Sequence, residues 1–226
     1  MHPLRSFLFA PGNHPRKVEK VFQVGADVVI LDLEDAVAIT EKPATRATIV
    51  DALKKKHRGL GYVRINSLDT EFAWGDFAGV VGAWVDGIVL PKVETADQLQ
   101  TADWVLAQLE RENGMEVGGI DLLPIIETGL GLHNVEAITM AGTRIKRVSF
   151  GAGDFTRDMN LVWTGPEQEL AYARGRIVLA SRAAGIEPPI DSVFIDLKDR
   201  EHLELSTQKA LEFGFQGKLC IHPDQV

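Results

Sequence analysis

The sequence contains a single cysteine, Cys220, among its 226 residues, which excludes a disulfide bond within the chain. It also has no apolar run near the roughly 18 residues that a membrane-spanning helix needs. The apolar stretch close to the N-terminus is too short for a signal peptide, and no small-residue cleavage site follows it. These absences predict a chain without membrane segments in a reducing compartment, and we expect a cytoplasmic protein.

Positive charge is scarce as well, because 24 lysines and arginines stand against 32 acidic residues, for a formal net charge of −8. This balance disfavours nucleic acid as a partner and leaves only a local basic patch for small anionic ligands. The sequence has no linker-like or low-complexity tract, since its Pro, Gly and Ser residues are scattered. We therefore expect residues 1–226 to form one domain.

Segments of strand character and helix character alternate along the chain. The strand-like segments are short and mostly apolar throughout, which is typical of strands buried on both faces. We expect eight of them, at Ser6–Ala10, Asp27–Leu33, Tyr62–Asn66, Gly87–Leu90, Leu122–Ile126, Arg147–Phe150, Ser192–Ile195 and Lys218–Ile221. A strand followed by a helix, repeated in this way, predicts a parallel sheet.

The helical patterns lie between these strands. We expect helices at Pro15–Val24, Lys42–Lys56, Glu71–Val81, Thr95–Glu112, Leu130–Met140, Pro166–Ala184 and Arg200–Phe213. With eight strands in one domain, the pattern favours a (β/α)8 TIM barrel over an open doubly wound sheet. The GxGxxG motif of dinucleotide-binding folds is absent, and we interpret Gly129-Leu130-Gly131 as a turn that opens a helix.

Polar residues follow most of the expected strands, which matters because a TIM barrel forms its active site at the C-terminal ends of its strands. They are Asn13, Asp32, Glu34, Asp35, Arg64, Asn66, Lys92, Glu127, Asp154, Asp196 and His222. Asn13 and Asp35 also fit a plain structural role, since Asn or Asp after a strand often caps the next helix. His222 fits either a general base or a packing and hydrogen-bonding residue before Pro223.

Two of these carboxylates directly close apolar strands. Glu127 follows Leu122–Ile126, and Asp154 follows the run Ser149–Gly153. Such a carboxylate is costly to bury unless it is paired or binds a cation, and magnesium takes few protein oxygens while leaving positions open for substrate. We predict a magnesium site on Glu127 and Asp154. The glycines before Asp154, including Gly153, let backbone N–H groups approach a substrate carboxylate.

Two basic residues interrupt or follow apolar strands. Arg64 introduces a guanidinium whose planar fork matches a substrate carboxylate. The alternative for Arg64 is a buried ion pair with an acid such as Asp32. Lys92 offers a similar choice between contact with a ligand and structural pairing with Glu34 or Asp35.

A cluster of cations lies after the first expected strand, where Gly12-Asn13-His14-Pro15 leads into a helix with Arg16, Lys17 and Lys20. Arg16 and Lys20 share one helix face at i and i+4. A helix N-terminus with nearby cations is a plausible phosphate clamp at the rim of the barrel mouth. The alternative is a solvated basic helix face.

An ordered series of motifs gives the sequence a family resemblance. The motifs are RSFLFAPGN, then VVILDLEDAV followed by Lys42 and Ala44-Thr45-Arg46, then VRIN, LPKVE, IIET, SFGAGDFTRD and GKLCIHPDQV. The sequence resembles the citrate lyase beta subunit-like family of the HpcH/HpaI aldolase superfamily over essentially its whole length. The resemblance implies a TIM barrel, usually a homotrimer, that uses magnesium to cleave acyl-CoA hydroxy acids such as citryl-CoA, malyl-CoA or citramalyl-CoA. The reaction implied is a retro-Claisen cleavage to an oxo acid and an acyl-CoA.

The resemblance also implies roles for individual residues. Glu127 and Asp154 match the family's magnesium ligands, and Arg64 matches the arginine that contacts the substrate, so Arg64 and Glu127 are the catalytic residues. Phe9, Arg16 and Lys20 match positions that contact coenzyme A in relatives, more weakly because residue types vary there.

The family's general base is implied to be an aspartate in a C-terminal segment that closes over a neighbouring subunit's site. This sequence stops at Val226, before such a segment. We therefore expect the final barrel helix and the C-terminal segment to be missing from this chain.

Other functions remain open on the sequence alone. A thioesterase or synthase acting on malyl-CoA-type substrates would use the same site, as would an aldolase acting on a free oxo acid, although the phosphate clamp disfavours the aldolase. A noncatalytic subunit that binds magnesium, oxo acid and CoA but lacks the base is a further alternative. The resemblance also allows a substrate tethered to an acyl carrier protein.

Overall fold

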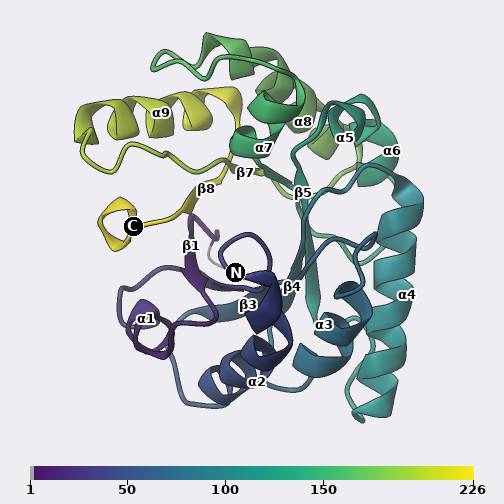
Figure 1. Cartoon of the computed structure of the whole chain (residues 1–226). Helices are drawn as coiled ribbons and strands as arrows, with labels where there is room; N and C mark the ends of the chain where they lie inside the picture. Colours follow the sequence, from purple (N-terminus) through teal and green to yellow (C-terminus); the bar gives the residue numbers. More distant parts are fainter. Residues whose placement is uncertain (1–2) are drawn as a thin grey trace.

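Eight parallel strands close into a barrel in the computed structural model, which describes residues 3–226 (Figure 1). Neighbouring strands are consecutive in the sequence, and β1 pairs with β8 to complete the barrel. The strands are β1 (Ser6–Pro11), β2 (Val28–Asp32), β3 (Leu60–Arg64), β4 (Gly87–Leu90), β5 (Asp121–Ile126), β6 (Ser149–Phe150), β7 (Ile190–Asp191) and β8 (Gly217–Cys220). The predicted TIM barrel is confirmed.

Helices surround the barrel on its outside (Figure 1). They are α1 (Pro15–Val21), α2 (Lys42–Leu53), α3 (Ala73–Val80), α4 (Ala96–Glu112), α5 (Gly129–His133), α6 (Val135–Thr139), α7 (Ala152–Asp158), α8 (Ala171–Ala183) and α9 (Arg200–Phe213), with short 3-10 helices η1 (Ile39–Glu41), η2 (Gln168–Leu170) and η3 (Pro223–Gln225). Within the described residues, β8 leads into η3 and no α-helix follows it. None of the helices in residues 3–226 combines the length and apolar character needed to cross a membrane.

Two apolar cores lie on the two sides of the strands. The inner core, inside the barrel, consists of Phe7, Val28, Ile30, Tyr62, Val89, Leu123, Ile125, Ile190 and Leu219. The outer core packs the intervening strand residues, such as Leu8 and Leu31, against the helices. Because side chains alternate along a strand, a residue two positions beyond the inner core also points into the barrel, at its C-terminal end.

The seventh strand lies outside the range predicted for it, Ser192–Ile195, because β7 consists of Ile190–Asp191. Asp191 interrupts the apolar pattern from which a strand is predicted. Its buried carboxylate is paired with Arg174 and Lys218, which come from other elements. A local window of sequence cannot reveal such distant partners.

The helices also differ in two places from the prediction. The segment Leu130–Met140 forms two short helices, α5 and α6, which meet at Asn134. The sequence pattern did not indicate α7, which carries Asp154 in its first turn, because glycines at its start weaken the helical signal. The remaining predicted helices occur, with ends that shift by a few residues.

Candidate active site

A cavity of about 370 Å³ lies at the mouth of the barrel, at the C-terminal ends of its strands. Strand alternation brings Asp32, Arg64 and Glu127 to it, because each lies two residues beyond an inner-core position. The predicted site residues that line this cavity are Phe9, Arg64, Glu127, Gly153 and Asp154. The fold therefore brings together residues that are far apart in the sequence.

Glu127 follows β5 and is almost completely buried, with 3% of its surface exposed. Its Oε1 accepts a hydrogen bond of 2.8 Å from the backbone N–H of Lys92. Burial raises the pKa of Glu127 to about 8; the charges of Glu34 and Asp154 add to the increase, and Arg64 opposes it. The protein by itself therefore does little to stabilise the ionised form of this carboxylate.

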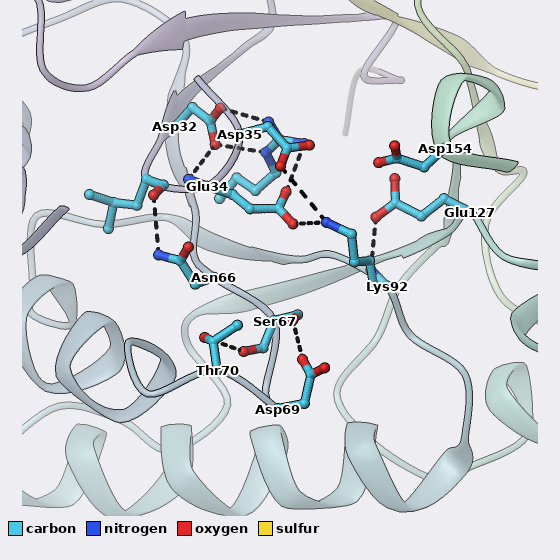
Figure 2. A network of polar contacts seen from close by, with 12 residues as sticks. Asp32, Glu34, Asp35, Asn66, Ser67, Asp69, Thr70, Lys92, Glu127 and Asp154 are labelled. Atoms are coloured by element: carbon cyan, nitrogen blue, oxygen red, sulfur yellow. Dashed lines mark hydrogen bonds and ion pairs between the residues drawn. The ribbon is translucent and has the colours of Figure 1, made fainter. Parts of the chain in front are cut away.

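Asp154 lies in the first turn of α7, and its carboxylate lies beside that of Glu127 at the cavity (Figure 2). The exposed Arg157 places Nη1 3.3 Å from Asp154 Oδ1. Gly151 makes room for the neighbouring acid, since a Cβ at this position would lie 2.5 Å from Glu127 Oε2. A side chain at position 151 would therefore compete with the Glu127 carboxylate for the same space.

The carboxylate pair fits a magnesium ion. Within residues 3–226, no group of three or more His, Cys, Asp or Glu side chains is arranged to hold a metal. Magnesium does not require one, because it usually takes one or two protein carboxylates and completes its octahedron with water and substrate oxygens. Glu127 and Asp154 supply two carboxylates, and the hydrogen bond from Lys92 engages only Oε1 of Glu127.

Arg64 is held at the mouth by two carboxylates. Its Nε and Nη2 donate to Asp32 at 2.7 and 2.6 Å, and Nη1 lies 3.0 Å from Glu34 Oε2. The buried ion pair with Asp32, considered as an alternative from the sequence, is therefore present. Arg64 also lies over the Phe9 ring, with Cζ 4.9 Å from the ring centroid. Each terminal nitrogen carries a second N–H, so the guanidinium, which lines the cavity, can also bind an anion.

A lysine on each side fixes the loop after β2. The Lys92 ammonium forms an ion pair with Glu34 and lies 3.9 Å from Asp35 Oδ1, as the structural alternative for Lys92 proposed. On the buried side, Lys42 Nζ donates to the carbonyl oxygens of Leu33 and Glu34 at 2.8 and 2.5 Å. The two ammonium groups thus hold the Glu34 segment in one conformation.

Arg16 and Lys20 do not reach the cavity. Both are exposed on α1, and neither is among the residues that line the barrel mouth. A larger open groove, of about 850 Å³, lies between α1 and α2, but the charged residues at the strand ends do not converge on it. The role of Arg16 and Lys20 in binding CoA stays a prediction.

Three other polar residues have structural surroundings. The Nδ1 atom of His222 accepts the backbone N–H of Asp224 at 3.3 Å, which matches its hydrogen-bonding alternative. Asn13 donates to Glu41 at 2.7 Å and does not cap α1, so its predicted capping role is wrong. Asp196 lies in an exposed loop and not at a strand end, because β7 ends earlier than predicted.

Two contacts that shape the site could not be predicted from the sequence. Ser192 Oγ accepts the backbone N–H of Ala152 at 2.8 Å and so anchors the start of α7. Lys92 has a positive φ of 51°, which directs its N–H toward Glu127. A serine after an aspartate and a lysine after a proline are both too ordinary to indicate these roles.

The fold and the site together define a TIM-barrel protein with two neighbouring carboxylates and an arginine lining the cavity at its mouth. The sequence model of the HpcH/HpaI aldolase/citrate lyase family matches residues 5–223. The citrate lyase subunit beta of Leuconostoc mesenteroides subsp. cremoris is 39% identical over 224 residues, which cover 98% of this chain and 74% of that protein. The chain therefore belongs to the HpcH/HpaI aldolase/citrate lyase family.

Two further relatives differ in the name they carry or in the ligands found in their structure. An L-malyl-CoA/beta-methylmalyl-CoA lyase of Cereibacter sphaeroides is 35% identical over 246 residues, covering 99% of this chain and 77% of the relative. The crystal structure of CitE from Mycobacterium tuberculosis in complex with magnesium, acetoacetate and coenzyme A is 28% identical. It superposes with a TM-score of 0.79, covering 99% of this chain and 78% of that one.

Proposed function

We propose that this chain is a magnesium-dependent carbon–carbon lyase that cleaves a 3-hydroxyacyl-CoA of the citryl-, malyl- or citramalyl-CoA type. The products are an oxo acid and an acyl-CoA. The observation that carries the proposal is the convergence of Glu127, Asp154 and Arg64 on one cavity at the barrel mouth. Membership of the family, and the names and ligands of the relatives, support the reaction class and the magnesium cofactor.

Glu127 and Asp154 would hold the magnesium ion, since both carboxylates border the cavity. Bound there, magnesium supplies Lewis-acid stabilisation for the negative charge that develops on the substrate oxygen. The Lys92 N–H fixes Oε1 of Glu127, which keeps the carboxylate oriented toward the cavity. The buried position of Glu127 limits competition from bulk water.

Arg64 would bind the carboxylate of the oxo-acid half of the substrate through the second N–H groups of its terminal nitrogens. Asp32 and Glu34 prevent the guanidinium from turning away. Fewer backbone N–H groups near Asp154 are available to bind a substrate carboxylate than the glycine-rich sequence predicts. Those of Gly151 and Ala152 already donate to Ile126 O and Ser192 Oγ, which leaves those of Gly153 and Asp154.

The cleavage step requires the substrate hydroxyl to lose its proton while the adjacent carbon–carbon bond breaks. The hydroxyl carbon becomes the carbonyl of the oxo acid, and the bonding electrons pass to the α carbon of the acyl-CoA, which then gains a proton. As the family resemblance implies, we propose that an aspartate outside residues 1–226 supplies the base. Arg64 and Glu127 would then bind and orient the substrate without exchanging these protons.

The thioester would extend from the cavity past the end of β1. Phe9 lines the cavity there, and α1 with the exposed Arg16 and Lys20 follows in the chain. We propose that these two cations contact CoA phosphates. A homotrimer, an acyl carrier protein as partner and a cytoplasmic location stay predictions from the sequence and the family resemblance.

The proposal is tested by assaying cleavage of citryl-, malyl- and citramalyl-CoA with and without magnesium. The protein assayed should include any residues that follow Val226 in the natural chain. Glu127→Gln should lower kcat/KM at least about 100-fold, because it removes a charged metal ligand. Glu112→Gln, at the exposed end of α4, provides a matched control that should retain full activity.

Magnesium-dependent cleavage that Glu127→Gln abolishes would establish the lyase. Hydrolysis of the thioester without carbon–carbon cleavage would instead assign a thioesterase. Binding of magnesium and an oxo acid, measured calorimetrically, without turnover of any CoA or carrier-bound substrate would make the protein a binding subunit and reject the lyase proposal.

A further inference from the structure

Lys92 adopts a backbone conformation that L-amino acids rarely occupy. Its φ is 51°, and among residues 3–226 only Asn160 and Glu167 are other non-glycine residues with positive φ. Asn tolerates this region because its short side chain bonds locally, whereas lysine gains nothing of the kind. Strain of this sort persists only where the surroundings enforce it, and it is often found at functional sites.

Two contacts enforce the conformation, and they reach two different carboxylates (Figure 2). The backbone N–H of Lys92 donates to Glu127 Oε1 at 2.8 Å. The side-chain ammonium of the same residue is paired with Glu34 Oε1 and lies 3.9 Å from Asp35 Oδ1. Lys92 therefore connects the end of β5 with the loop after β2 through a single residue.

The ammonium also affects which cations pair with Glu34 at the mouth of the barrel. Glu34 is buried, and its second oxygen lies 3.0 Å from Arg64 Nη1. Without a cation on its first oxygen, Glu34 would depend on Arg64 alone, which already holds Asp32 through two hydrogen bonds. The pairing with Lys92 keeps Glu34 in place and leaves the outer N–H groups of Arg64 free.

We infer that Lys92 is a positioning residue: its ammonium, anchored on Glu34, holds the backbone in the left-handed conformation that aims the N–H at Glu127. The hydrogen bond occupies Oε1 and so turns the carboxylate toward Asp154 and the magnesium ion that the pair would bind. Lys92 does not touch the metal in this arrangement. The inference rests on the magnesium site of the proposed function.

Three substitutions separate the anchor from the backbone conformation. Lys92→Arg keeps a cation for Glu34, although with a different shape. Lys92→Met keeps the length of the side chain but removes the cation, so the backbone is no longer held. Lys92→Gly also removes the cation, yet glycine occupies positive φ without a steric penalty.

The readout is the dissociation constant for magnesium alone, measured by isothermal titration calorimetry without substrate. We expect Lys92→Arg to bind within about threefold of the wild type, Lys92→Gly to be weakened by about threefold to fivefold, and Lys92→Met by about tenfold or more, the range typical for groups that orient metal ligands. Thermal unfolding of each variant checks that it is folded.

The direction of the change in magnesium affinity distinguishes a positioning role of Lys92 from a purely electrostatic effect of its charge. Removing a positive charge beside a cation site should strengthen magnesium binding on electrostatic grounds alone. If Lys92→Met and Lys92→Gly both bind magnesium as tightly as the wild type, or more tightly, the inference is wrong while the metal site stands. If the wild type binds no magnesium and Glu127→Gln changes nothing, the proposed function fails and the inference fails with it.

Discussion

A single buried carboxylate makes the stability of the metal-free protein depend on pH. Because the folded state raises the pKa of Glu127 to about 8, folded molecules keep a proton that unfolded molecules release near the ordinary carboxyl pKa. The contribution of Glu127 to stability is fully present below the unfolded pKa. It is lost as the pH rises toward the folded value, after which no further loss occurs.

We therefore expect the wild type to lose stability relative to Glu127→Gln between about pH 5 and pH 7.5, by on the order of 1 kcal/mol per pH unit. The measurement is the free energy of unfolding from urea titrations in the presence of a chelator. The glutamine variant is the control, since it has nearly the same shape and all the other titrating groups. Parallel pH profiles for the two proteins would contradict the prediction.

At the residue scale, the sequence indicated which residues meet at the barrel mouth better than it indicated how they are held there. Glu127 was predictable at the mouth because it directly follows an apolar strand, and Asp154 because it comes a few residues after one. Arg64 was predictable because it is a cation inside such a run. The left-handed backbone of Lys92 was not predictable, since it depends on partners from β2 and β5 that only the folded chain brings together.

At the element scale, α8 carries two arginines that pair in different environments. Arg174 is fully buried and contacts Asp191 at 2.9 Å and Glu167 at 3.0 Å. Arg176, two residues later, pairs with Glu136 at 2.6 Å, but both side chains are partly exposed. The helix thus offers an internal comparison between a buried ion pair and a surface ion pair.

We expect Arg174→Met to destabilise the protein by about 3 kcal/mol or more, because it leaves the buried Glu167 carboxylate without its cation. Arg176→Met should cost less than about 1 kcal/mol, as is usual for exposed pairs. Urea unfolding monitored by circular dichroism measures both changes. Equal losses for the two variants would show that burial does not set the strength of these contacts.

Strand prediction at this scale succeeded where the partners of a strand were apolar and failed where they were charged. β4 was predicted to the residue because Gly87–Leu90 is apolar throughout. β7 was not, because Asp191 needs Arg174 and Lys218 to be acceptable in a barrel strand. Uniformly apolar strands also conceal which residues face the barrel interior, so the side on which each site residue would emerge could not be read from the pattern.

At the scale of the whole molecule, Cys220 reports on the integrity of the barrel. It lies on β8, the strand that pairs with β1, and 3% of its surface is exposed. Burial raises the pKa of its thiol to about 11, so the reactive thiolate is rare at neutral pH. Both effects protect the thiol as long as β8 remains in the barrel.

We expect a thiol reagent at pH 8 to modify native Cys220 at least about 1,000-fold more slowly than the urea-unfolded chain. The rate should increase with urea in step with global unfolding measured by circular dichroism. Labelling of the native protein at a rate close to that of the unfolded chain would mean that β8 detaches locally while the rest of the barrel stays folded.

The pairing of β1 with β8 also has a consequence for biosynthesis. Its register joins Ser6 to Lys218 and Leu8 to Cys220, so the contact that closes the barrel links segments from opposite parts of the chain. Until β8 has emerged from the ribosome, the earlier strands can form only an open sheet with free edges. Such edges are prone to pair with strands of other chains. Arg64, Glu127 and Asp154, which line the mouth, are by then already synthesised, but the barrel that holds them together is complete only when its eighth strand arrives.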